Sequence, residues 1–146
     1  MKKYITQLLL LTLLNLLTFC ASKKNLKANF PQEITSMSFE KWTGGRRETG
    51  SGTKVSIEFK KPLQKNIHLQ KIYFQNQETE IVQENETKYS ASFHSNALYR
   101  EQHSSDAASK NFNLKDNEAV IEYQNHNKTY FYKCSNIKEI PMIMYE

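Results

Sequence analysis

Thr53-Lys-Val-Ser-Ile-Glu-Phe-Lys60 alternates without a break between apolar and polar side chains. Its apolar members are Val55, Ile57 and Phe59, while the residues between them are charged or carry a hydroxyl group. A period of two is the pattern of a strand with one buried face, whereas an amphipathic helix repeats its apolar residues every three or four positions. This stretch therefore predicts a β-strand and indicates an all-β fold.

Similar alternation recurs on both sides of this strand. It is clearest in residues 37–42, 66–74, 88–94, 118–123 and 128–135. The pattern shifts its phase between Leu69 and Ile72, which predicts a β-bulge or burial on both faces. Pro141 divides the apolar run 137–145 as in an edge strand. We expect residues 66–94 to form a three-stranded meander. The chain as a whole predicts a single antiparallel sandwich or partly closed barrel of about seven to eight strands.

The N-terminal residues have the features of an export signal. Lys2 and Lys3 precede a leucine-rich run over residues 8–19, and small residues follow it. Because this run is shorter than the roughly 20 apolar residues that span a bilayer, it predicts a cleaved signal helix rather than a membrane anchor.

The signal can end in two ways. Leu17-Thr-Phe-Cys20 resembles a bacterial lipobox, in which cleavage before the cysteine leaves a lipid on its sulfur, although Phe19 stands where the lipobox usually has a small residue. Cleavage after Ser22 would instead release a soluble exported protein. We favour lipidation at Cys20, since a cysteine at the end of the apolar run is otherwise hard to explain.

Lipidation at Cys20 predicts three segments. Residues 1–19 are the signal peptide, residues 20–33 are a basic tether and residues 34–146 are the β domain, which is of ordinary size for one domain. Cys134 is the only cysteine besides Cys20, so the domain forms no internal disulfide, and its alternating surroundings predict a buried, inert thiol.

Charge is unevenly distributed along the chain. Removal of Lys2 and Lys3 with the signal lowers the formal net charge from +5 to +3. Residues 23–77 hold eleven bases and four acids, whereas residues 78–146 hold seven bases and eleven acids. A basic front half favours anionic lipid, an anionic glycan or an acidic protein as a partner. We expect no nucleic acid partner, because no nucleic-acid-binding motif is present.

All four glycines lie within residues 43–52, which predicts a hairpin loop of special shape. Trp42 borders this loop and Arg46 and Arg47 lie within it. Because Trp and Arg are enriched at binding hot spots, these three residues are the candidate binding site. The simpler interpretation is that Trp42 caps the core and the two arginines are solvated. The polar segment 95–110 is a second, longer loop that we expect to contribute to the contact surface.

The sequence offers few groups for catalysis or metal binding. His68, His94, His103 and His126 have no metal-ligand spacing, so we expect no metal and no cofactor. Glu78 and Glu80 share one face of a predicted strand, and paired carboxylates of this kind could cleave a glycoside. Solvated acids at a strand edge are the simpler interpretation.

Several short segments together resemble a family of small exported bacterial β-domain proteins, many of them lipoproteins, of uncharacterised function. These segments are Trp42-Thr-Gly-Gly-Arg46, Gly50-Ser-Gly52, Lys71-Ile-Tyr-Phe74, Leu114-Lys-Asp-Asn-Glu-Ala-Val120 and Lys128-Thr-x-x-Tyr-Lys133. The resemblance implies an exported β domain and supplies no catalytic residues.

These features predict an envelope-associated lipoprotein with a non-catalytic binding or structural domain. Its partners would be the membrane, through the lipid on Cys20, and an envelope protein or an anionic glycan. The alternative hypothesis is an envelope hydrolase that uses the acidic strand edge at Glu78 and Glu80.

Overall fold

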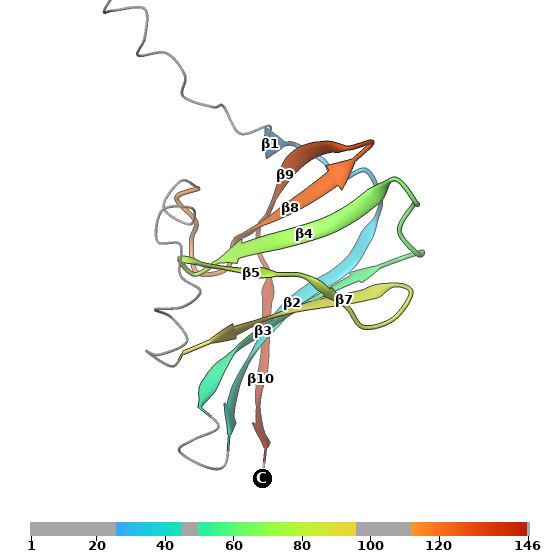
Figure 1. The fold of residues 1–146 in the computed structure, drawn as a ribbon. Helices are drawn as coiled ribbons and strands as arrows, with labels where there is room; N and C mark the ends of the chain where they lie inside the picture. The colour runs from blue at the N-terminus through green and yellow to red at the C-terminus, as the bar shows by residue number, and fades with distance from the viewer. Residues whose placement is uncertain (1–25, 45–49, 96–111, 146) are drawn as a thin grey trace, which may run out of the picture.

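The computed structural model describes residues 26–44, 50–95 and 112–145, and within these ranges the chain forms strands and turns without a helix (Figure 1). The all-β prediction is therefore confirmed, while the predicted signal helix lies outside the described residues. The strands are β1 (Leu26–Lys27), β2 (Ile34–Gly44), β3 (Ser51–Phe59), β4 (Ile67–Phe74), β5 (Gln77–Glu80), β6 (Val82–Gln83), β7 (Lys88–His94), β8 (Ala119–Asn125), β9 (Lys128–Cys134) and β10 (Lys138–Tyr145).

The strands form two five-stranded sheets. Sheet A has the order β1-β9-β8-β4-β5, and sheet B has the order β10-β2-β3-β7-β6. Neither sheet closes into a barrel. The prediction of a purely antiparallel fold is wrong, because β1 pairs parallel with β9 and β10 pairs parallel with β2. Alternation reveals which residues are buried but not strand direction, and neither parallel pair is joined by the tight hairpin that would enforce an antiparallel arrangement.

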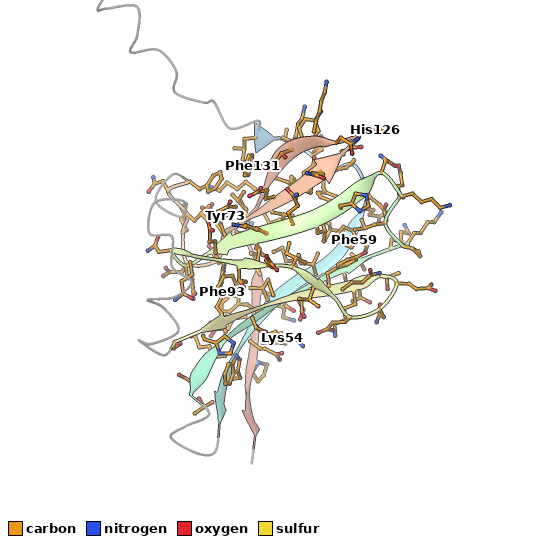
Figure 2. The ribbon with its side chains drawn as sticks, viewed as in Figure 1. Lys54, Phe59, Tyr73, Phe93, His126 and Phe131 are labelled. Carbon is orange, nitrogen blue, oxygen red and sulfur yellow. The ribbon has the colours of Figure 1, made fainter. Side chains whose placement is uncertain are left out.

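One hydrophobic core lies between the two sheets. Phe39 of β2 contacts Phe74 of β4 across the core, with ring centroids 5.1 Å apart. Val55 and Ile57 of the strand 53–60 are fully buried and Phe59 is almost so, as the alternation predicts. Figure 2 labels Phe59 and Phe93, which sheet B contributes to this core.

The segment 77–83 connects the two sheets. β5 pairs with β4 at the edge of sheet A, and β6 pairs with β7 at the edge of sheet B. Between them Ile81 packs on the core, and its amide donates a hydrogen bond to the Gln70 carbonyl over 3.0 Å. The predicted three-stranded meander is therefore wrong, because the chain passes from sheet A to sheet B at Ile81 instead of adding a third strand to one sheet.

Irregular positions adjust the sheets locally. The register of β4 against β8 shifts between Leu69 and Lys71, which confirms the predicted bulge. β10 is an edge strand, as predicted, and its register with β2 shifts between Ile140 and Ile143, around Pro141. Proline lacks the amide hydrogen that a ladder requires, so a bulge at this position keeps the rest of the strand paired.

The N-terminal segment packs on the domain before β2 begins. The sequence predicts a tether over residues 20–33, and within that range Leu26 and Lys27 pair with β9. Phe30 lies 4.7 Å from the Tyr123 ring in sheet A and 5.5 Å from the Phe59 ring in sheet B, measured between centroids. In the part of the chain that the structure describes, no helix is long and apolar enough to cross a membrane.

Candidate functional site

Trp42 lies on the outer face of sheet B, opposite the core. It is in register with Gly52 of β3, which in turn is in register with His94 of β7. The indole and imidazole rings meet edge to face, with centroids 5.4 Å apart and planes 82° apart. His94 thus limits the orientation of the indole, because an edge-to-face pair is a preferred aromatic geometry.

Gly52 is what allows Trp42 to lie across the sheet. A Cβ atom at this position would lie 2.8 Å from both Cε2 and Cζ2 of Trp42 and would clash with the carbonyl oxygen of Phe93. Any larger residue would therefore displace either the indole or the β7 backbone. The sequence predicts that the glycine cluster shapes a loop. Gly52 instead lies within β3, where its lack of a side chain makes room for the indole ring.

Small and charged side chains cover the rest of this face. One row across three strands consists of Ser38, Ser56 and Ser90, and the next row toward Trp42 consists of Glu40, Lys54 and Ser92. Charged side chains therefore lie directly beside the indole, and the hydroxyl groups of the three aligned serines lie one row farther from it. The outer face of sheet B therefore combines a half-buried aromatic ring with hydrogen-bonding groups.

Glu84 lies between two lysines on the same face. Its Oε1 is 2.7 Å from Nζ of Lys54, and its Oε2 is 3.6 Å from Nζ of Lys88. Hydrogen bonds from Lys54 and then Ser90 lower the pKa of the Glu84 carboxyl below its ordinary value. The carboxylate is therefore ionised at neutral pH and offsets the positive charge of the two lysines.

The other predicted site residues belong to segments that the structure does not describe. Arg46 and Arg47 lie in residues 45–49, outside the described residues, as do Cys20 and most of the predicted loop 95–110. The ends of the first of these segments are fixed, because the Gly44 amide donates to the Gly50 carbonyl over 2.9 Å. Gly50 adopts a φ of 71°, a left-handed conformation that favours glycine.

The acidic pair of the hydrolase hypothesis lies on the outer face of sheet A. Nζ of Lys71 is 3.0 Å from Oε1 of Glu78, whose side chain is only 11% exposed, while Glu80 is exposed. The bond from Glu78 raises the pKa of Lys71, which therefore stays protonated and holds this carboxylate in an ion pair. The second carboxylate oxygen of Glu78 is buried and has no hydrogen-bond partner.

A second carboxylate on this face is also engaged. The Tyr73 hydroxyl donates a hydrogen bond to Oε2 of Glu122 over 2.5 Å. Burial, together with this bond, raises the pKa of Tyr73. Glu78 and Glu122 are therefore held by Lys71 and Tyr73, and Glu80 is exposed, whereas two glycosidase carboxylates face each other across a cleft.

Cys134 is buried in the core of the domain, and burial raises the pKa of its thiol to about 12. A thiol of this kind is almost entirely protonated at neutral pH and is a poor nucleophile. Among the described histidines, His68 and His126 are exposed, and His94 packs against Trp42. Within the described ranges, no group of three or more His, Cys, Asp or Glu side chains is arranged to hold a metal ion.

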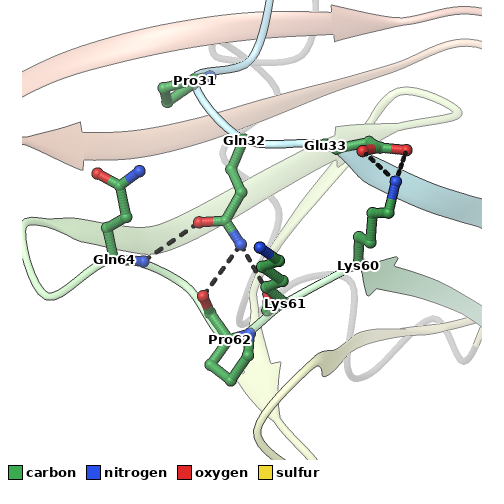
Figure 3. A pocket seen from close by; sticks show the side chains of 7 residues that line it. All are labelled: Pro31, Gln32, Glu33, Lys60, Lys61, Pro62 and Gln64. Atoms are coloured by element: carbon green, nitrogen blue, oxygen red, sulfur yellow. Dashed lines mark hydrogen bonds and ion pairs between the residues drawn. The ribbon is translucent and has the colours of Figure 1, made fainter.

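Two hollows lie away from Trp42. The larger, of about 400 Å³, is lined by residues 31–33, 60–62 and 64. Gln32 spans it: its amide nitrogen donates to the carbonyl oxygens of Lys61 and Pro62 over 2.6 and 3.1 Å, and its amide oxygen accepts from the Gln64 amide (Figure 3). The smaller, of about 230 Å³, lies at the ends of β4 and β7. Gln32 therefore ties the N-terminal segment to residues 61–64 across the larger hollow.

Comparisons with protein-family models, with curated proteins and with solved structures found no match to this chain. Its function therefore has to be inferred from the geometry of its side chains.

Proposed function

We propose that the protein is an exported lipoprotein whose β domain binds a partner at the cell envelope and catalyses no reaction. The arrangement of Trp42 carries this proposal. The indole lies on the outer face of a sheet instead of in the core, and Gly52 and His94 hold it there. A fixed aromatic ring on a solvent-facing sheet is suited to binding, because little side-chain entropy is lost when it meets a partner.

The proposed tether begins at Cys20. The described chain starts at β1, only six residues after this cysteine, so a lipid on its sulfur would hold the domain within about 20 Å of the bilayer. Trp42 lies far from that attachment point. β2 runs from Ile34 beside the tether to Gly44, and eight residues of strand separate Ile34 from Trp42, roughly 26 Å.

The hydrolase alternative has less support. It needs two carboxylates that reach one substrate, with one of them able to donate a proton. Glu78 instead forms an ion pair with Lys71, and Glu122 accepts from Tyr73. Neither of the two hollows is lined by Glu78 or Glu80. We therefore favour a binding function, with an envelope protein or an anionic glycan as the partner and no nucleic acid.

The binding surface is tested by changing Trp42. We expect Trp42→Ala to reduce capture of the partner from an envelope extract at least tenfold, because the aromatic platform is lost, and Trp42→Phe to retain part of the capture. Asn117→Ala, in an exposed turn before β8 of sheet A, is the control. Melting temperatures would show that each variant is folded. Equal capture by wild type and Trp42→Ala would exclude this surface.

The tether is tested by the intact mass of the protein purified from membranes. We expect a lipid-modified chain that starts at Cys20, and the Cys20→Ser variant should lose both the modification and the membrane association. An unmodified chain that starts at Lys23 would show that the protein is released after export.

A further inference from the structure

Three segments that are distant in the sequence meet at the end of the domain where the described chain begins. The His126 amide, in the β8–β9 turn, donates to the carbonyl of Asn66 over 3.2 Å, and the side chain of Asn66 donates to Asn125 over 2.6 Å. On the neighbouring edge, Nζ of Lys27 in β1 lies 4.7 Å from the centroid of the Tyr130 ring. Figures 1 and 2 show β1 and the turn at His126 at the same end of the molecule.

This end is strongly basic, and we call it the basic end. It carries five exposed lysines, namely Lys27, Lys60, Lys61, Lys65 and Lys128. Two acids lie near them: Glu33 forms an ion pair with Lys60 over 3.0 Å, and Glu86 lies in the turn whose Thr87 carbonyl accepts a hydrogen bond from the amide of Phe59, next to Lys60. The remaining described residues hold seven lysines against nine acids, so the formal charge is +3 at the basic end and −2 elsewhere.

Most of this positive charge has no partner within the domain. Lys61, Lys65 and Lys128 form no ion pair with any residue that the structure describes. By contrast, Lys41, Lys54, Lys71, Lys88 and Lys133 each contact a glutamate. Unpaired lysines gathered from two separate segments favour an anionic surface outside the protein.

We propose that the basic end docks the domain on the anionic headgroups of a phospholipid membrane. This inference rests on the proposed function, in which the lipid on Cys20 holds β1 close to the bilayer. The span of about 20 Å allows the lysines to reach the surface, where the potential of anionic lipids acts within a Debye length of about 8 Å. Each lysine at such a surface contributes about 1 kcal/mol of binding.

The lysines are spread over the basic end instead of converging on one cavity. Gln32 spans the nearby hollow and donates to two of its carbonyl groups, and Lys60 at its edge is paired with Glu33 (Figure 3). Binding should therefore respond to the charge density of the membrane and to salt. Docking in this orientation would direct the Trp42 end of β2 away from the bilayer, toward a partner.

Sedimentation with vesicles tests this docking directly. The test uses the unlipidated chain from Lys23 onward, which contains every described residue. This stretch is present in the mature protein whether the signal is cleaved before Cys20 or after Ser22. We expect it to bind vesicles of phosphatidylcholine mixed with phosphatidylglycerol, to release them at high salt and to ignore pure phosphatidylcholine. The double variant Lys65→Gln/Lys128→Gln should bind about thirtyfold more weakly, from two contributions of about 1 kcal/mol.

The matched control is Lys115→Gln/Lys138→Gln, which removes the same charge from exposed lysines elsewhere. Its affinity for the vesicles should lie within about threefold of that of the wild type, because a lysine is attracted to the membrane only when it lies close to the charged surface. Equal weakening by both double variants, or equal binding to neutral vesicles, would overturn the proposal. Binding to a soluble anionic glycan without binding to phosphatidylglycerol vesicles would also overturn it.

The two proposals fail in different experiments. A lipidated Cys20 in a chain that ignores anionic vesicles would exclude the docking surface and leave the tether intact. Vesicle binding by a chain that carries no lipid in the cell would instead exclude the tether and leave the surface.

Discussion

The missing side chain of Gly52 determines the position of Trp42. The indole lies too close to the position of a Cβ atom at residue 52 for such an atom to fit, and the carbonyl oxygen of Phe93 approaches the same position from β7. Relief of this clash requires the β7 backbone to move, which is harder than the rotation of a flexible side chain. The proposed binding surface is therefore sensitive to one methyl group.

Gly52→Ala tests this dependence. We expect it to lower the free energy of unfolding by about 2 kcal/mol, because the added methyl overpacks two strands, and to weaken capture of the partner as the indole moves. Urea denaturation measures the first effect. Ser56→Ala, on the same strand and face, should change stability by less than about 0.5 kcal/mol. A Gly52→Ala variant as stable as wild type would show that β3 and β7 move apart at this position with little cost in free energy.

Part of this site could be predicted from the sequence. Trp42 is the single tryptophan and lies beside the glycine cluster, so the sequence alone indicates it as a candidate binding residue. The contribution of His94 could not be predicted, because 52 residues separate it from Trp42 and only the pairing of β3 with β7 brings them together. The pairing of two non-adjacent strands leaves no signal in a single sequence.

Two-residue turns connect β4 to β5 and β8 to β9. Both residues of each turn have positive φ, at 46° and 60° for Gln75 and Asn76 and at 49° and 61° for His126 and Asn127. This is the geometry of type I′ turns, whose twist matches that of the strands they join. Asparagine adopts this conformation more readily than most residues, which explains its position in both turns.

Asn76→Ala is expected to reduce stability by about 1 kcal/mol, because alanine does not adopt positive φ without strain. Asn76→Gly should be at least as stable as wild type. Asn117→Ala changes an exposed turn residue without positive φ and is the control, with little expected effect. Thermal unfolding of the three variants measures these differences, and equal melting temperatures for Asn76→Ala and Asn117→Ala would contradict the strain argument.

Most strands could be predicted, but not their grouping into sheets. Alternation identified the buried faces of β3, β7, β8 and β9, and its change of phase identified the bulge in β4. It did not reveal that the chain changes sheets at Ile81 or that β10 runs parallel to β2. Period-two alternation is a local property of one strand, whereas neighbours and directions depend on contacts between distant residues.

At the scale of the whole molecule, Phe30 joins the N-terminal segment to both sheets. Its ring contacts Phe59 of sheet B and also Tyr123 and Tyr132 of sheet A. The residues that link the proposed tether to the domain are therefore part of its packing, and the basic end is held in a fixed relation to the core.

Phe30→Ala should lower the free energy of unfolding by about 2 kcal/mol, because it removes a partly buried ring between the sheets. Leu26→Ala is the control, since Leu26 is 52% exposed and should contribute little. Chemical denaturation compares the two, and amide hydrogen exchange of residues 26–33 should speed up in Phe30→Ala only. Identical exchange in both variants would show that Phe30 does not hold this segment.

The parallel pairing of β2 with β10 also affects when the protein can fold. β2 spans residues 34–44, and its partner spans residues 138–145, so sheet B stays incomplete until residue 145 has been synthesised. Contacts between residues so far apart in the sequence make folding slow. Slow folding of this kind would suit the export proposed above, because an extended chain can pass through a narrow channel before it acquires its native form.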